Sequence, residues 1–194
     1  IIDVAGSDQP LFNADRSIAL VFNGEIYNYR ELRQQLAADG FSFSTEGDGE
    51  TLIHLYQRDG LQMFQQLRGM YAFALWDTRH ERLVLAVDHI GIKPLYLHQQ
   101  DGLLRFSSEV KSFFVDDAVT PELNLRGMDT YLSFGFQVGA ETLFKHVRRL
   151  MPGHVLIAEK GQVTETQVWQ FGDVDETLSQ HDEASIIAQT RELL

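Results

Sequence analysis

Cysteine is missing from this 194-residue sequence, and its absence narrows the chemistry that the chain can carry. Without a thiol, the chain has no disulfide, no thiolate metal site and no cysteine nucleophile of its own. The lack fits a reducing compartment, although cysteine-free secreted proteins also exist. Basic residues are scarce too, since 16 lysines and arginines stand against 28 acids for a formal charge of −12. So acidic a chain is a poor candidate for binding nucleic acid or an anionic membrane by long-range attraction, and we expect neither partner.

A long hydrophobic run is also missing. The longest uninterrupted apolar stretch, 70–76, is far shorter than the ~20 residues that a membrane span needs. The chain begins IIDV, without a methionine or a basic and apolar leader, so no secretory signal is visible and we expect a cytoplasmic protein. Because residues 184–194 predict a helix that stops in mid-pattern, both ends look cut, and we expect a piece of a longer protein.

The residues that are present suit a folded domain. Hydrophobic residues make up 44% of the chain and aromatic residues 11%, which is enough for a packed core. The length fits one domain, or one domain and the start of another. The seven histidines show no spacing typical of a metal site, because His80-Glu81 lacks a second histidine and no His-x-His pair occurs. We therefore expect no bound metal.

Hydrophobic patterns predict strands paired in hairpins, with the helices grouped in separate blocks. Strands are expected over 17–22, 70–77, 82–88, 94–99, 103–108, 154–160 and 162–169. Helices are expected over 29–39, 49–59, 109–114, 124–132 and 184–194. This grouping is typical of an α+β fold with antiparallel sheets, not of βαβ alternation. The acidic segment 172–183 predicts a linker between a domain over 1–171 and the start of another domain at 184–194.

Local signals refine the segment that follows the first strand. Asn23-Gly24 is a strong turn dipeptide and predicts that the strand ends there. Asn28 and Glu31 have the spacing of a capping box, and Asp48 stands where it could cap the helix over 49–59. An asparagine amide beside a backbone N–H also supplies the two donors that an oxyanion hole needs. From Asn-Gly alone, a plain tight turn is the simpler interpretation.

Further motifs follow one another along the chain. They are IID…G…QPLFN (1–13), LVFNGEIYNYREL (20–32), GDGETLIHLY (47–56), LRGMYAFALWD (67–77), GIKPLYL (91–97), FSSEVKSF (106–113) and MPGH (151–154). With these motifs the chain resembles the glutaminase domain of glutamine-hydrolysing asparagine synthetases, a class II glutamine amidotransferase of the N-terminal-nucleophile hydrolase type. The resemblance covers most of residues 1–170.

The resemblance implies a fold and an activity. The fold is a four-layer αββα sandwich of two antiparallel sheets. Such domains hydrolyse glutamine with an N-terminal cysteine, and ammonia passes to a synthetase domain that uses ATP and Mg to amidate aspartate. This chain contains neither that cysteine nor the synthetase domain, so we expect no cofactor in it and no glutaminase activity from it alone.

The resemblance also assigns site residues. Asn23, through its side-chain amide, and Gly24, through its backbone N–H, match the oxyanion hole. Asp48 matches the carboxylate that binds the α-ammonium of glutamine, and Glu25 lies beside it. Ile2 belongs to a stretch whose backbone helps hold the substrate α-carboxylate. The simpler alternatives are a helix N-cap for Asp48, an exposed acid for Glu25 and an ordinary strand start for Ile2.

Departures from the family pattern leave alternatives open. The family usually has an arginine on each side of Asp88, and here Val87 and His89 take those places. Gly49 stands where a larger residue is common. The intact protein could amidate another acceptor, or the domain could be a non-catalytic interaction module. The residue after the initiator methionine would separate the enzyme from the module. Loss of the N-terminal segment is expected to expose a sheet edge and an apolar face, so a homodimer is possible.

Overall fold

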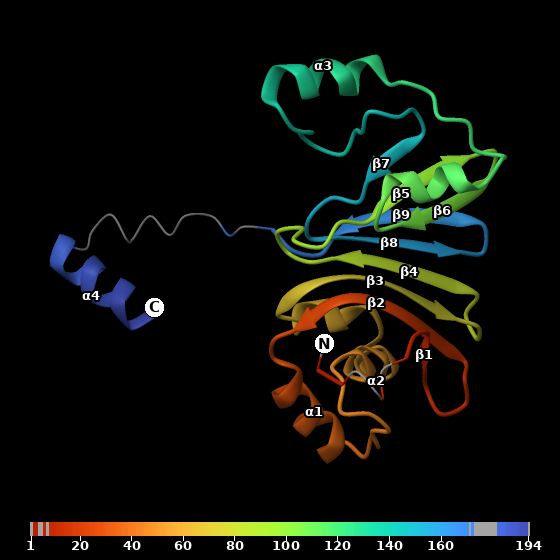
Figure 1. The fold of residues 1–194 in the computed structure, drawn as a ribbon. Helices are drawn as coiled ribbons and strands as arrows, with labels where there is room; N and C mark the ends of the chain where they lie inside the picture. Colours follow the sequence, from red (N-terminus) through yellow and green to blue (C-terminus); the bar gives the residue numbers. More distant parts are fainter. Residues whose placement is uncertain (1, 4–5, 7, 171, 173–181, 194) are drawn as a thin grey trace.

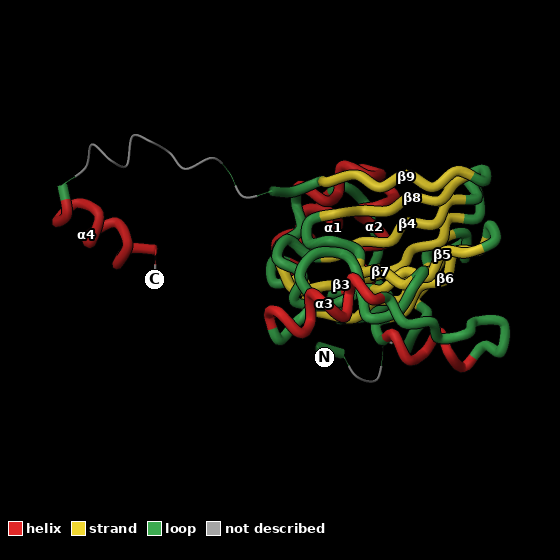
Figure 2. The backbone as a smooth tube through the Cα atoms, turned by 90° about the horizontal axis from the view of Figure 1, so that it is seen from above, coloured by secondary structure: helices red, strands yellow, loops and turns green. Residues whose placement is uncertain are grey.

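The computed structural model describes residues 2–3, 6, 8–170, 172 and 182–193, and most of its strands form one antiparallel sheet. In spatial order this sheet contains β1 (Leu11–Phe12), β2 (Ile18–Ile26), β3 (Gly69–Asp77), β4 (Arg82–Val87), β8 (His154–Glu159) and β9 (Gln162–Gln167). A smaller antiparallel sheet contains β6 (Leu103–Ser107), β5 (Tyr96–Gln100) and β7 (Val147–Arg149). Figure 2 shows β9, β8 and β4 running side by side.

The two sheets and the helices form four layers. Helices α1 (Tyr29–Ala38) and α2 (Gly49–Asp59), with the 3-10 helix η1 (Gly60–Gln65), cover one face of the large sheet. The small sheet covers the other face, and the 3-10 helix η2 (Val110–Val115) and α3 (Leu125–Phe134) lie outside it (Figure 1). The predicted αββα sandwich is therefore confirmed. A last helix, α4, spans Glu183–Leu193.

Alternation along β3 explains why the layers stack as they do. Phe73 and Leu75 point to the helices and pack with Leu36 and Leu52, whereas Ala72 and Ala74 point to the small sheet. Because both sets are buried, β3 is covered on both faces, as its nearly continuous apolar sequence predicts. One core thus lies between the helices and the large sheet, and a second lies between the two sheets.

The prediction that the first strand ends at Asn23-Gly24 is wrong. Strand β2 continues to Ile26, with Asn23 opposite Ala72 and Gly24 opposite Tyr71. Gly24 has a φ of 151°, and a Cβ there would collide with the carbonyl oxygen of Met70. Glycine therefore lets the strand pass close to β3, where any larger residue would force the strands apart.

The predicted capping box at Asn28 is also wrong. Helix α1 begins directly after Asn28, but the side chain caps nothing. Its amide donates to the carbonyl of Gln66 at 2.8 Å and accepts from the N–H of Arg68 at 3.0 Å. Asn28 therefore fixes the start of α1 to the segment that enters β3.

Most of the other predicted elements are present within a few residues of their expected ends. The segment expected as a helix over 109–114 is a 3-10 helix, and β1, β7 and η1 had no prediction because they are too short for a periodic pattern. The predicted linker 172–183 lies mostly outside the described residues. Among the residues that the structure describes, no helix is both long and apolar enough to cross a membrane.

Candidate active site

A cavity of about 450 Å³ lies where the last half of β2 meets the start of α2. Ile2, Asn23, Gly24, Glu25 and Asp48, the five residues that the family resemblance singles out, all line it. They come from three separate segments of the chain. The cavity therefore gathers in one place what the sequence scatters over almost fifty positions.

The cavity opens along the free edge of β2. In a strand, the backbone N–H and C=O of alternate residues point to the same edge. On this edge Leu20 is paired with β1, the amide and carbonyl of Phe22 bind the side chain of Gln9, and the amide of Ile26 binds Asp48. Gly24 lies between Phe22 and Ile26 in the same alternation, so its N–H points toward the cavity.

Asp48 holds its place through β2 and not through its own helix. Its Oδ2 accepts a hydrogen bond from the N–H of Ile26 at 2.8 Å, and it makes no side-chain bond that caps α2. The helix start predicted after Asp48 is confirmed, whereas the predicted capping bond is wrong. Instead, the carboxylate of Asp48 accepts from the backbone amide of Ile26, which lies on the open edge of β2.

Asp48 is buried, and burial disfavours the charged form of its carboxyl group. Only 8% of the residue is exposed. Burial raises the pKa of the Asp48 carboxyl above its ordinary value, the hydrogen bond from Ile26 opposes this rise, and the nearby charge of Glu25 adds to it. An ammonium group that binds beside a buried carboxylate stabilises the charged form of that carboxylate.

Glu25 and Ile2 complete the predicted set. Glu25 is half-buried and lies within β2, so it is not an exposed acid beside a turn. Ile2 is 36% exposed at the cavity wall, and Ile1 lies outside the described residues. The next residue, Asp3, accepts from the N–H of Glu46 at 3.0 Å, which ties this segment to the loop before Asp48.

Glu50 orders that loop from the other side. Its carboxylate accepts from the N–H groups of Ser44 and Thr45 at 2.8 to 3.0 Å and from the Thr45 hydroxyl at 2.9 Å. Burial favours a higher pKa for Glu50, but these donors outweigh it and the pKa is lowered. In the Asp48-x-Glu50 triplet, one acid therefore faces the cavity and the other holds the loop that carries it.

Sequence reasoning missed the role of Gln9. Its Oε1 accepts from the N–H of Phe22 at 2.6 Å, and its Nε2 donates to the carbonyl of Phe22 at 2.7 Å. The side-chain amide thus replaces one residue of a neighbouring strand. The QPLFN motif was visible in the sequence, but nothing in it indicated which backbone group this amide would meet.

Sequence reasoning also missed Lys93. The buried carboxylate of Asp88 folds the segment that carries Lys93 and so brings this lysine to the cavity. Asp88 has no exposed surface, and its two oxygens accept from the backbone N–H groups of Tyr71, Ile90, Ile92 and Lys93 at 3.0 to 3.1 Å. These bonds fold the GIKP segment into a compact loop. The loop places the half-buried Lys93 on the cavity wall.

An apolar trough leads away from the cavity. Asn23 also lines a hollow of about 260 Å³, which shares Val21, Ala74 and Phe106 with a further hollow of about 160 Å³ that reaches Trp76. Val21 is 43% exposed and Trp76 is 41% exposed. An apolar strip is therefore open along β2 and β3. No group of three or more His, Asp or Glu side chains able to hold a metal occurs among the described residues.

The chain is similar to known amidotransferases over most of its length. A family model described as a glutamine amidotransferase domain matches residues 1–169. Glutamine-hydrolyzing asparagine synthetase 1 of Bacillus subtilis is 39% identical over 165 residues, which are 84% of this chain and 26% of that protein. Amidase chyE of Penicillium rubens is 37% identical over 186 residues, which are 95% of this chain and 27% of that protein. The chain thus spans about a quarter of the length of these relatives.

Solved structures share the fold. Glutamine phosphoribosylpyrophosphate amidotransferase from B. subtilis, in a complex with ADP and GMP, matches 84% of this chain and 32% of its own. The TM-score is 0.61 and the sequence identity is 23%. At this identity the similarity supports the arrangement of sheets and helices and carries no residue role.

Proposed function

The chain belongs to the family of glutamine amidotransferase domains, and from that premise we propose that its intact protein hydrolyses glutamine to glutamate and ammonia in this cavity. The observation that carries the proposal is the shared cavity, in which two candidate oxyanion donors and a buried acid lie together. The family match alone gives the reaction class. The shared cavity supports the roles proposed below for the individual groups.

Asn23 and Gly24 serve the bond-breaking step. The thiolate of the intact protein's N-terminal cysteine attacks the side-chain carboxamide carbon of glutamine, and the carbonyl oxygen becomes an oxyanion. The Asn23 amide and the Gly24 N–H donate to this oxygen. Ammonia then leaves after protonation, and water hydrolyses the thioester to glutamate. A donor of this kind contributes about 3–4 kcal/mol to transition-state stabilisation.

Asp48 and its neighbours recognise the amino-acid end of the substrate. Asp48 binds the α-ammonium group, Glu25 adds negative charge beside it, and the backbone at Ile2 helps hold the α-carboxylate. Lys93 supports this assignment, because the cavity wall then carries both signs of charge, as a zwitterion requires. A small zwitterion needs only these local groups, so the overall charge of −12 implies no special partner.

The acceptor belongs to the rest of the intact protein. We propose a cytoplasmic synthetase domain that uses ATP and Mg to amidate aspartate with the ammonia released here. The similarity to amidase chyE and the replacement of the flanking arginines by Val87 and His89 favour a second candidate, in which another carboxylate is the acceptor. An acceptor screen with ATP and glutamine separates them, because failure to form asparagine from aspartate would favour the second.

Substrate recognition is tested by Asp48→Asn in the intact protein. The amide keeps the shape and the bond to Ile26 but loses the charge, so we expect KM for glutamine to rise at least tenfold, which is about 1.4 kcal/mol. The control is Asp117→Asn, an exposed acid outside the cavity, which should leave KM unchanged. An unchanged KM in Asp48→Asn would contradict the proposal that Asp48 binds the α-ammonium group of glutamine.

A further inference from the structure

The outermost helix of the sandwich exposes its apolar side chains. On α3 and the segment after it, the exposed fractions are 67% for Leu125, 74% for Leu132, 62% for Phe134, 62% for Phe136 and 49% for Val138. We call these five residues the α3 surface. A single residue of α3, Gly127, is buried, and it lies against the carbonyl of Thr142. Exposed apolar side chains this densely placed mark an interaction site on a folded domain.

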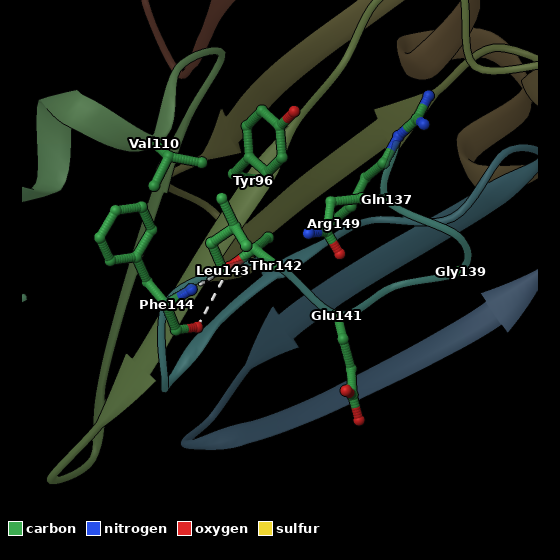
Figure 3. A pocket seen from close by; sticks show the side chains of 9 residues that line it. All are labelled: Tyr96, Val110, Gln137, Gly139, Glu141, Thr142, Leu143, Phe144 and Arg149. Atoms are coloured by element: carbon green, nitrogen blue, oxygen red, sulfur yellow. Dashed lines mark hydrogen bonds between the residues drawn. The ribbon is translucent and has the colours of Figure 1, made fainter. Parts of the chain in front are cut away.

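A small pocket adjoins the α3 surface. It has a volume of about 170 Å³, and Tyr96, Val110, Leu143 and Phe144 give it an apolar wall. Figure 3 shows these side chains grouped together, while Glu141 points away from them. A bridge between Leu123 and Phe144 joins the pocket wall to the start of α3.

Two polar atoms at this pocket lack a partner. Oε1 of Gln137 and Nε of Arg149 are buried without a hydrogen bond among the residues that the structure describes. Both atoms have almost no exposed surface, so a group from outside reaches neither of them unless these side chains move. Because buried polar atoms are nearly always paired, the pocket is an unusual part of the fold.

Charge is depleted around the same surface. Residues 123–144 contain only three charged residues among 22, Arg126, Asp129 and Glu141, whereas 23% of the whole chain is charged. Arg126 and Glu141 also form an ion pair at 3.5 Å. Loss of charge with gain of aromatic and aliphatic side chains is typical of the core of a stable interface.

We infer that the α3 surface and its pocket are covered by another domain of the same polypeptide, the synthetase-like part that the relatives carry beyond the matched quarter of their length. This inference rests on the proposed function. A domain linked in the same chain meets this surface at high effective concentration, which suits a contact made once and kept. A second copy of the chain is the competing occupant.

Photo-crosslinking in the intact protein identifies the occupant. The photoreactive residue p-benzoylphenylalanine replaces Phe134, or replaces Val115 on η2 as a matched control that is 84% exposed and outside the α3 surface. The expected product is a crosslink within one polypeptide, from position 134 to a peptide of the synthetase-like part, at least fivefold above the control. A crosslink between two copies, or a yield equal to the control, would overturn the inference.

A coupling assay tests the same surface without a crosslinker. Leu132→Ser in the intact protein should lower the moles of amide formed per mole of glutamate by at least threefold, with glutamine hydrolysis within twofold of the parent. Val115→Ser should change neither. An unchanged ratio in Leu132→Ser contradicts the inference, whereas a parent protein that crosslinks but hydrolyses no glutamine contradicts the proposed function alone.

Discussion

Asp77 is a buried carboxylate at the end of β3, and its surroundings keep it ionised. It has no exposed surface, and its oxygens accept from the Nδ1 of His80 at 2.7 Å, the N–H of Arg79 at 2.9 Å and the hydroxyl of Tyr56 at 3.2 Å. Burial favours a higher pKa for Asp77, but hydrogen bonds from His80 and Arg79 outweigh it and lower the pKa to about 2. The β3–β4 turn therefore depends on this negative charge.

The lowered pKa sets a pH window for stability. The folded carboxyl has a pKa of about 2 against an ordinary value of 3.8, so its stabilising effect is complete above pH ~4 and is lost as the pH falls toward 2. The difference corresponds to about 2 kcal/mol. We expect Asp77→Asn to lower the free energy of unfolding at pH 7 by about 1–3 kcal/mol and to flatten its dependence between pH 4 and pH 2.

Urea unfolding at a series of pH values measures both effects. Asp101→Asn, at the exposed tip of the β5–β6 hairpin, is the matched control and should follow the parent curve. If the Asp77→Asn variant lost as much stability between pH 4 and pH 2 as the parent does, then protonation of Asp77 would not be the cause of the parent's loss.

Single residues were the hardest feature to predict. The sequence correctly predicted Asp48 at the start of a helix. It could not predict that the carboxylate would accept from the N–H of Ile26, because that amide is 22 positions away. The amide is available only because the edge of β2 is open at this point. Gln9 and Phe22 pose the same problem across 13 positions. Local propensity predicts caps and turns, whereas competition from a distant backbone group decides them.

At the scale of elements, Asn28 links α1 to β3, and two substitutions separate this role from capping. Asn28→Ala removes both bonds to Gln66 and Arg68, so we expect it to lower the free energy of unfolding by about 1–2 kcal/mol. Glu31→Ala changes an exposed side chain of the same helix and should cost less than about 0.5 kcal/mol. Thermal or urea unfolding of the two variants measures the difference. A capping box between Asn28 and Glu31 would make the two losses similar. Equal losses would therefore support a capping box and contradict the linking role of Asn28.

The elements themselves were largely predictable, and the failures have a common cause. Strands β3, β4, β5, β6 and β8 follow their apolar patterns because each packs at least one face into a core. Strand β9 is mostly exposed and is held by its hairpin pairing with β8. The sequence prediction ended β2 too early, at Asn23-Gly24, because the Asn-Gly dipeptide has strong turn propensity. Its pairing with β3 through Gly69 overrides that propensity, and a local pattern carries no record of this partner.

At the scale of the whole molecule, the four layers bring the cavity and the apolar trough into contact. The trough between the sheets begins at Asn23 and continues to Trp76. Asn23 therefore lies where the cavity and the trough meet.

Activity should therefore depend on the intact protein. The purified 194-residue chain contains no cysteine, so we expect no release of glutamate from glutamine above the uncatalysed rate. The intact protein under the same conditions is the comparison. Hydrolysis by the 194-residue chain would mean that another group is the nucleophile.

The turnover of glutamine by Asn23→Ala in the intact protein tests the central assignment most directly. Alanine removes one oxyanion donor and leaves the backbone of β2 and the acid at Asp48 in place. We predict that kcat falls by about 10²–10³ while KM changes less than threefold and the thermal stability stays near that of the parent. A kcat equal to that of the parent would contradict the oxyanion role of Asn23 and with it the proposed use of this cavity.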